Sequence, residues 1–141
     1  MKNHNGASMK IKVKNYHFKN LYNKLYDSDW LDAELTIINS TGKVSINLEL
    51  LLVEELERII NWLNQILNKN NVTNKLEFVD PNLRLKLLTR SSMPVLKVMY
   101  NINENIIECW ELLIKTADIN KLVNELKITI NNYPCRCGFI H

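Results

Sequence analysis

Two runs of alternating apolar and polar residues, joined by a short glycine-containing segment, constrain the fold of this chain most strongly. Every second residue is apolar from Leu31 to Ile37, and the alternation returns from Val44 to Leu50. A period of two places successive side chains on opposite faces of a strand. Ser40-Thr41-Gly42 lies between the runs and is a turn signal. We therefore expect an antiparallel hairpin whose first strand is Trp30–Ile38, with one buried and one solvated face.

A change of period from two to 3.6 predicts a helix directly after this hairpin. Over Val53–Asn68 the apolar residues fall on one stripe, formed by Val53, Leu56, Ile59, Ile60, Leu63, Ile66 and Leu67. Glu54 and Glu55 lie in its first turn, where the helix dipole favours negative charge. A second stripe predicts a helix over Ile119–Asn131, with Asp118 as its N-cap and Tyr133-Pro134 at its end.

The remaining segments return to a period of two. We expect strands at Met9–Lys14, Leu76–Phe78, Leu83–Leu87, Leu96–Ile102 and Ile106–Lys115, a loop at Ser91–Pro94, and one or two helical turns within Tyr16–Tyr26. The order β-β-β-α-β-β-β-β-α favours an α+β fold, with a curved antiparallel sheet of about six to seven strands and two amphipathic helices packed on it. Residues 9–137 are expected to form a single domain, and residues 1–8 a disordered start or a tag remnant.

Composition excludes several functional classes. The net charge is +3, from 18 basic and 15 acidic residues, and the scattered basic residues do not predict a nucleic-acid surface. No apolar run approaches the roughly 20 residues of a membrane-spanning helix, and the polar start does not resemble a signal peptide. Three cysteines, an odd number, fit a reducing compartment. We therefore expect a cytoplasmic protein that does not bind membranes.

The residues that build catalytic and metal centres are scarce. Histidine occurs only at positions 4, 17 and 141, so a histidine-based centre would have to use His17. Three glycines do not suffice for a phosphate-binding loop. Cys135, Cys137 and His141 offer three soft ligands, but structural zinc sites take four and space their cysteine pairs more widely. We expect no catalytic residue, no metal site and no cofactor, and hence a protein that is not an enzyme.

Acidic residues gather around the start of the first alternating run. Asp27 and Asp29 lie in a predicted turn, and Asp32 and Glu34 lie on the polar face of the strand. Paired carboxylates in acid–base catalysis need a cleft and a positioned partner, so we interpret this group as a solvated face or a patch that contacts a partner. Trp62, beside the centre of the helical stripe, is either an aromatic anchor for that partner or a cover for the flank of the core.

Several further markers follow one another along the chain: Asp29-Trp30-Leu31 at the start of a long strand, Gly42 before an alternating strand, Glu55-Leu56 at the start of a helix, Leu76-Glu77-Phe78 through Pro81 to Leu83-Arg84-Leu85, and Tyr133-Pro134 with Arg136. In these markers residues 9–137 resemble the WapI-like immunity proteins. These are small bacterial proteins, many of them encoded beside polymorphic contact-dependent toxins.

The resemblance implies a non-enzymatic protein that binds a toxin domain of a sibling cell and occludes it. The resemblance does not identify which residues of this chain would bind the toxin. Many inhibitors of nucleases are acidic, and the net charge of +3 departs from that trait.

The residues also leave two other functions open. One is a small-ligand-binding domain with Tyr16, Phe18, Tyr22 and Tyr26 as its pocket wall, and the other is a scaffolding homo-oligomer that buries a strand edge or Trp62 between chains.

Overall fold

The computed structural model describes residues 2–4, 8–18, 29–39, 42–68, 73–90, 93–113 and 115–136. Its elements are β1 (Lys2–His4), β2 (Ser8–Tyr16), β3 (Trp30–Asn39), β4 (Gly42–Leu52), α1 (Val53–Asn68), β5 (Lys75–Glu77), β6 (Leu83–Arg90), β7 (Met93–Asn103), β8 (Ile106–Leu113) and α2 (Thr116–Asn132). From β2 onward they follow one another in the order that the sequence pattern predicts. The additional strand, β1, lies in the segment expected to be a disordered start or a tag remnant.

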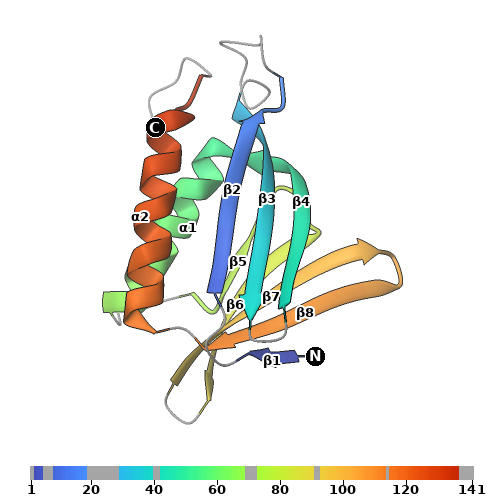
Figure 1. Cartoon of the computed structure of the whole chain (residues 1–141), viewed down its shortest axis with the longest axis vertical. Helices are drawn as coiled ribbons and strands as arrows, with labels where there is room; N and C mark the ends of the chain where they lie inside the picture. Colours follow the sequence, from blue (N-terminus) through green and yellow to red (C-terminus); the bar gives the residue numbers. More distant parts are fainter. Residues whose placement is uncertain are drawn as a thin grey trace.

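The described strands form two sheets (Figure 1). The smaller has the order β2-β3-β4 and is antiparallel. The larger has the order β1-β8-β7-β6-β5, in which β1 is parallel to β8 and the other neighbours are antiparallel. The predicted α+β class with two helices is confirmed, but the single curved sheet is wrong. Alternation determines which face a side chain takes, and it carries no information about which strands pair.

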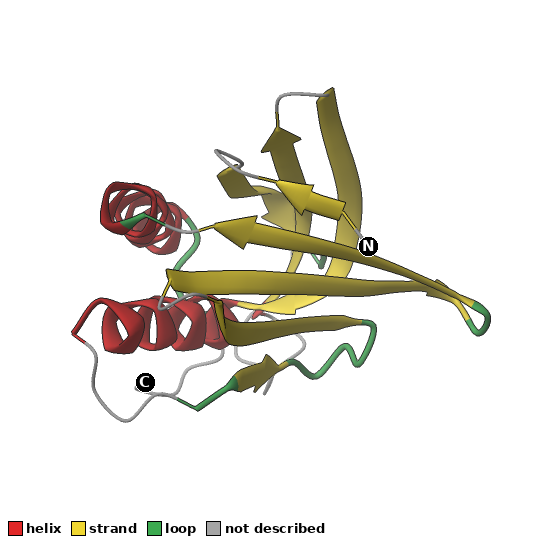
Figure 2. Cartoon of the chain, turned by 90° about the horizontal axis from the view of Figure 1, so that it is seen from below, coloured by secondary structure: helices red, strands yellow, loops and turns green. Residues whose placement is uncertain are grey.

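Both helices and both sheets share one hydrophobic core. The helix α1 continues directly from β4, and its stripe residues Leu56, Ile59 and Leu63 are fully buried. They belong to the same apolar cluster as Leu35 of the smaller sheet and Leu96 of the larger one. Figure 2 shows the two helices beside the strands, and Figure 1 shows α2 alongside α1. The outer face of β2, β3 and β4 is thereby left for solvent or a partner.

Two boundaries differ from the sequence-based expectation. The helix α2 begins at Thr116 after the N-cap Lys115. Asp118 lies in the first turn, where its Oδ2 accepts the Lys115 N–H at 3.3 Å. An acidic residue is favourable both as an N-cap and in the first turn, so the pattern does not distinguish the two. Pro94, expected in a loop, is the second residue of β7, and it precedes Val95, at which the pairing of β7 with β8 begins.

The aromatic segment predicted as helical turns is described only at its start. Tyr16 is the last residue of β2, and Phe18 follows it as an exposed bend residue. The remainder, residues 19–26, lies outside the described part of the chain.

In the hairpin formed by β3 and β4, Gly42 is the first residue of β4 and has a φ of +149°. Residues with a side chain rarely adopt a φ of this sign, so glycine suits this position.

The β7–β8 hairpin projects beyond the rest of the molecule (Figures 1 and 2). Its inner part lies in the core, where Trp110 and Leu112 of β8 are buried. The strand β8 has a neighbour on each side, β7 and β1. Its outer part, from Ile106 to Glu108, is exposed. The hairpin therefore joins a packed base to an exposed end.

Candidate functional site

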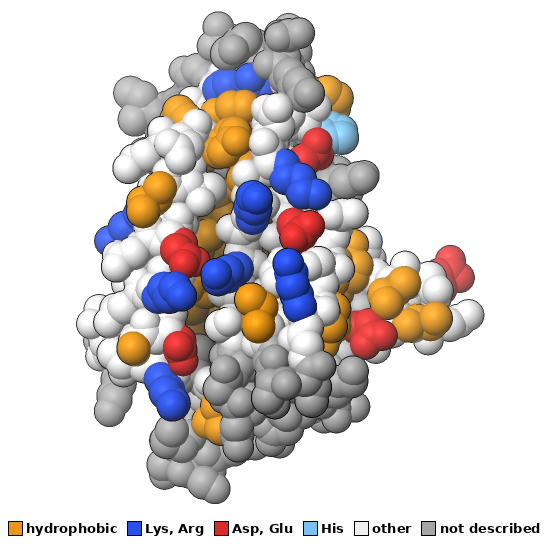
Figure 3. Space-filling view, in the orientation of Figure 1, with side chains coloured by type: hydrophobic (Ala, Val, Ile, Leu, Met, Phe, Trp, Pro, Cys, Tyr) orange, Lys and Arg blue, Asp and Glu red, His pale blue; other side chains and the backbone are white. Residues whose placement is uncertain are grey.

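The polar face of the smaller sheet carries charges of both signs. Its side chains alternate with the core residues of β2, β3 and β4, and they are Lys10, Lys12, Lys14, Asp32, Glu34, Lys43, Ser45 and Asn47. Glu34 is the Cα partner of Lys12 on one side and of Asn47 on the other. Figure 3 shows basic and acidic side chains interspersed over the face seen in Figure 1. We name this surface the outer sheet face.

Asp32 and Glu34 lie on the outer sheet face, each beside a basic side chain. Asp32 Oδ1 is 2.7 Å from His17 Nδ1, and Glu34 Oε2 is 3.6 Å from Lys14 Nζ. All of these side chains are at least partly exposed, so both contacts are weak and open to exchange with a partner. The two carboxylates therefore form a mixed-charge surface with their neighbours, and not a purely acidic patch.

The other two acidic candidates are not part of that surface. Asp29 is buried, with 4% of its surface exposed, and its Oδ1 accepts the backbone N–H of Arg136 at 2.6 Å. Asp27 lies outside the described residues. Arg136 places its guanidinium 3.4 Å from the ring centre of Tyr16 and donates from Nη2 to the carbonyl of Phe18 at 2.7 Å. Asp29 thus helps to hold the C-terminal segment against the ends of β2 and β3.

Tyrosines complete this attachment. The Tyr16 hydroxyl donates to the Pro134 carbonyl at 2.5 Å, and the Tyr133 hydroxyl donates to the Lys14 carbonyl at 3.1 Å. The two rings meet edge to face at 5.4 Å. Tyr16, considered above as a pocket wall, therefore lies against the C-terminal segment, and Tyr22 and Tyr26 lie outside the described residues.

Trp62 covers the core. Its side chain is 3% exposed, and its Nε1 donates to the Thr73 carbonyl at 2.9 Å. A buried indole usually pairs its N–H in this way. Of the two interpretations that the sequence left open, this placement favours the cover for the flank of α1.

Sequence reasoning missed the structural importance of Glu55. Its side chain is only 1% exposed. Oε1 accepts the Leu52 N–H at 3.0 Å and Oε2 accepts the Val79 N–H at 2.8 Å. One carboxylate therefore ties the β4–α1 junction to the segment after β5. The sequence pattern showed only that an acid suits the first turn of a helix.

Burial raises the pKa of Glu55 above its usual value of 4.5, although the two backbone N–H groups act in the opposite direction. A raised pKa in the folded state means that the native protein holds this proton to a higher pH than the unfolded chain. The contribution of Glu55 to stability is therefore largest below pH 4.5 and falls as the pH rises through the folded-state pKa. In urea titrations between about pH 4 and 8, the free energy of unfolding of the wild type should fall relative to that of Glu55→Gln. Parallel curves would contradict the raised pKa.

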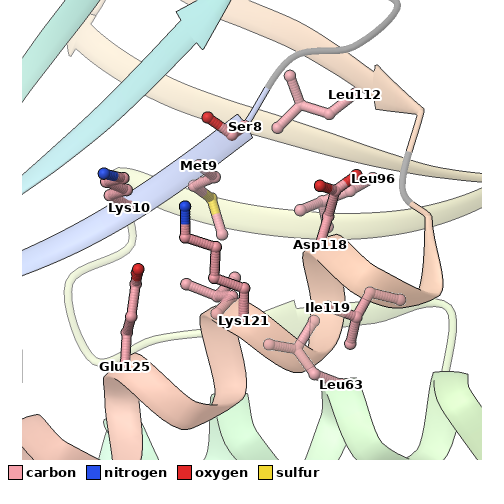
Figure 4. Close-up of a pocket in the computed structure, with 11 residues that line it drawn as sticks. Ser8, Met9, Lys10, Leu63, Leu96, Leu112, Asp118, Ile119, Lys121 and Glu125 are labelled. Carbon is pink, nitrogen blue, oxygen red and sulfur yellow. The ribbon is translucent and has the colours of Figure 1, made fainter.

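A small cavity lies where β2, α1, α2 and the larger sheet meet (Figure 4). Leu63, Leu96 and Leu112 line it, together with the charged residues Lys121 and Glu125. Its volume is about 60 Å³, room for about two water molecules, whereas ligand pockets usually measure about 300–1,000 Å³. The cavity does not fit a ligand of ordinary size.

The described residues were expected to lack a metal site and a membrane-spanning helix. They contain no group of three or more histidine, cysteine, aspartate or glutamate side chains placed to hold a metal ion. Cys135 is described, whereas Cys137 and His141 are not. Neither α1 nor α2 is long and apolar enough to cross a membrane.

The sequence of this chain matches a known protein family. The immunity protein WapI-like family matches residues 1–134. The chain belongs to this family. The resemblance inferred from the sequence is thereby confirmed. Two of the residues in the sequence markers also make contacts between distant segments: Asp29 accepts the N–H of Arg136, which lies beyond the matched residues, and Glu55 accepts the N–H of Val79. No curated protein and no solved structure matches the chain.

Proposed function

We propose that this protein is a cytoplasmic, non-enzymatic immunity protein that binds a cognate toxin domain and blocks it by steric occlusion. The observation that carries the proposal is the family match over residues 1–134, because immunity proteins neutralise toxins by binding them. The large shared core supports it, since a preformed surface loses little conformational freedom on binding.

The outer sheet face is one candidate contact surface. Its charges of both signs suit electrostatic steering of a partner and suppress wrong partners. Asp32 and Glu34 lie on it and remain candidate contacts. Trp62 and Asp29 are buried in this structure, so we leave them out of the proposed surface. Asp27, outside the described residues, stays a sequence-based candidate.

Reversing the two exposed charges tests this surface. Asp32→Lys combined with Glu34→Lys should weaken toxin binding about 10-fold, mainly through a slower association rate. The Lys14 pair would also become repulsive, and Asp32→Lys would remove the carboxylate that contacts His17. Glu57→Lys with Glu125→Lys changes the net charge equally on the helices and is the control. Surface plasmon resonance at two salt concentrations gives the rates, and circular dichroism checks the fold. Equal affinities for the two double variants would exclude Asp32 and Glu34 as contacts.

The proposed function itself is tested with the toxin domain encoded beside this protein's gene. Co-expression should restore growth of cells that produce the toxin, and the purified proteins should form a stoichiometric complex. Absence of both effects would contradict the proposal. A small molecule retained through purification and seen by native mass spectrometry would instead support ligand binding. A stable homo-oligomer without toxin affinity would support scaffolding.

A further inference from the structure

The end of the β7–β8 hairpin, residues Ile102–Glu108, is the most exposed apolar feature among the described strands. We call it the hairpin tip. Ile102, Ile106 and Ile107 are 54%, 48% and 54% exposed, on a ribbon that projects from the body (Figures 1 and 2). A single exposed isoleucine needs no explanation, but several at one projecting site indicate an interaction surface.

The isoleucines lie on both faces of the ribbon. Ile106 and Ile107 are adjacent in β8, so their side chains point to opposite faces. Their Cα partners in β7 are Asn103 and Asn101, and the register shifts between these two, at Ile102. A flat partner surface could cover only one of the two faces. A cleft with two apolar walls covers both.

The charged side chains of the hairpin tip are all negative. Glu104 and Glu108 are its charged residues, both exposed, and no lysine or arginine lies between Ile102 and Glu108. Figure 3 shows acidic and apolar side chains on this projection. The whole chain, in contrast, has a net charge of +3. A basic cleft is therefore the complementary surface for this part of the molecule.

The hairpin tip is held in shape before any partner arrives. Asn103 Oδ1 accepts the Asn105 N–H at 2.9 Å within the turn. At the base of the tip, the Asn101 N–H donates to the Asn82 carbonyl at 2.9 Å and ties the ribbon to the segment before β6. A preorganised ribbon loses less conformational entropy on insertion than a flexible loop would.

We propose that the hairpin tip inserts into a basic, apolar-walled cleft of the toxin, namely the cleft that binds an anionic substrate. The two glutamates would occupy the place of the substrate's negative charges, and the isoleucines on the two faces would contact the two walls. This inference rests on the proposed function and makes it specific. It explains how a chain with net positive charge can block a basic site.

The test compares three variants in binding to the toxin domain encoded beside the gene. Ile106→Ser with Ile107→Ser should weaken binding about 100-fold, because truncated central anchors dominate interface energies. Glu104→Lys with Glu108→Lys should slow association and reverse the sign of its salt dependence. Ile128→Ser removes an isoleucine on α2 that is 61% exposed and should leave the affinity unchanged. Heparin, a polyanion, should compete with the wild-type protein for the toxin.

The outcomes separate this inference from the proposed function. If the wild-type protein binds the toxin and both tip variants bind equally well, the hairpin tip is excluded and the immunity function stands. If the wild-type protein does not bind, both proposals fail. Heparin without effect would contradict the basic cleft. A wild-type dimer in analytical ultracentrifugation that Ile106→Ser with Ile107→Ser dissociates would assign the isoleucines to a second copy of this chain, and would overturn the inference.

Discussion

Replacing Glu55 with alanine should lower the free energy of unfolding by about 2–4 kcal/mol, because one buried and one partly buried backbone donor lose their acceptor at once. These donors are the N–H groups of Leu52 and Val79. They belong to segments that are 27 positions apart in the chain, and the Glu55 carboxylate bridges them. Water cannot easily replace a carboxylate whose side chain is only 1% exposed.

Two further variants separate the lost bridge from a general effect of the helix terminus. Glu55→Gln keeps the shape and one acceptor oxygen but brings an NH₂ group to the second donor, so its loss should be intermediate. Glu57→Ala removes another acid from the same helix turn and should cost less than about 0.5 kcal/mol, as surface substitutions usually do. Urea unfolding followed by circular dichroism gives all three values. A Glu55→Ala loss as small as that of Glu57→Ala would contradict the bridge.

Two of the residues from which the family resemblance was inferred have structural roles in this protein. Asp29 accepts the Arg136 N–H, and Glu55 accepts the Val79 N–H, so each of them closes a contact between distant segments. Such contacts are required by the fold whatever the protein binds. This is why the markers reveal the family but carry no information about the toxin. Binding specificity has to lie elsewhere, on surfaces such as the outer sheet face and the hairpin tip.

Single helices and strands could be predicted because each depends on the spacing of apolar residues within its own segment. The stripe from Val53 to Leu67 predicted α1 with its observed bounds, and the alternation around Gly42 predicted the β3–β4 hairpin. The division into two sheets could not be predicted in this way. Whether β4 pairs with β3 alone or also with a later strand depends on how the chain packs around α1, and the alternation of β4 is the same in both cases.

The candidate site was predicted only in part, for a related reason. The alternation along β3 predicted that Asp32 and Glu34 lie on the polar face of this strand, and both side chains are partly exposed there. Their pairing with His17 and Lys14 depends on the register of β2 against β3, where Lys12 lies opposite Glu34. The hairpin tip was not predicted, because two consecutive apolar residues such as Ile106 and Ile107 are more typical of a buried strand than of an exposed one. An apolar pair predicts burial, and only the projection of the ribbon shows that nothing in the described chain covers it.

Trp62 is the sequence-based candidate for which two roles were left open, a cover for the core and an anchor for a partner, and two substitutions distinguish them. Trp62→Ala should lower the free energy of unfolding by about 3–5 kcal/mol, because it leaves a cavity beside α1. Trp62→Phe should cost about 1–3 kcal/mol, through the lost bond to the Thr73 carbonyl and the smaller ring. Both losses follow from a side chain that packs against the core.

Toxin affinity provides the independent measurement. A tryptophan that serves only the core contributes nothing to the interface, so Trp62→Phe should bind the toxin domain as tightly as the wild type wherever both are folded. Trp30→Phe, at the partly exposed start of β3, is the matched tryptophan control. If Trp62→Phe kept its stability but lost affinity about 10-fold or more, Trp62 would be an anchor after all. The segment after α1 would then have to open on binding, because that segment supplies the carbonyl that holds the indole in the free protein.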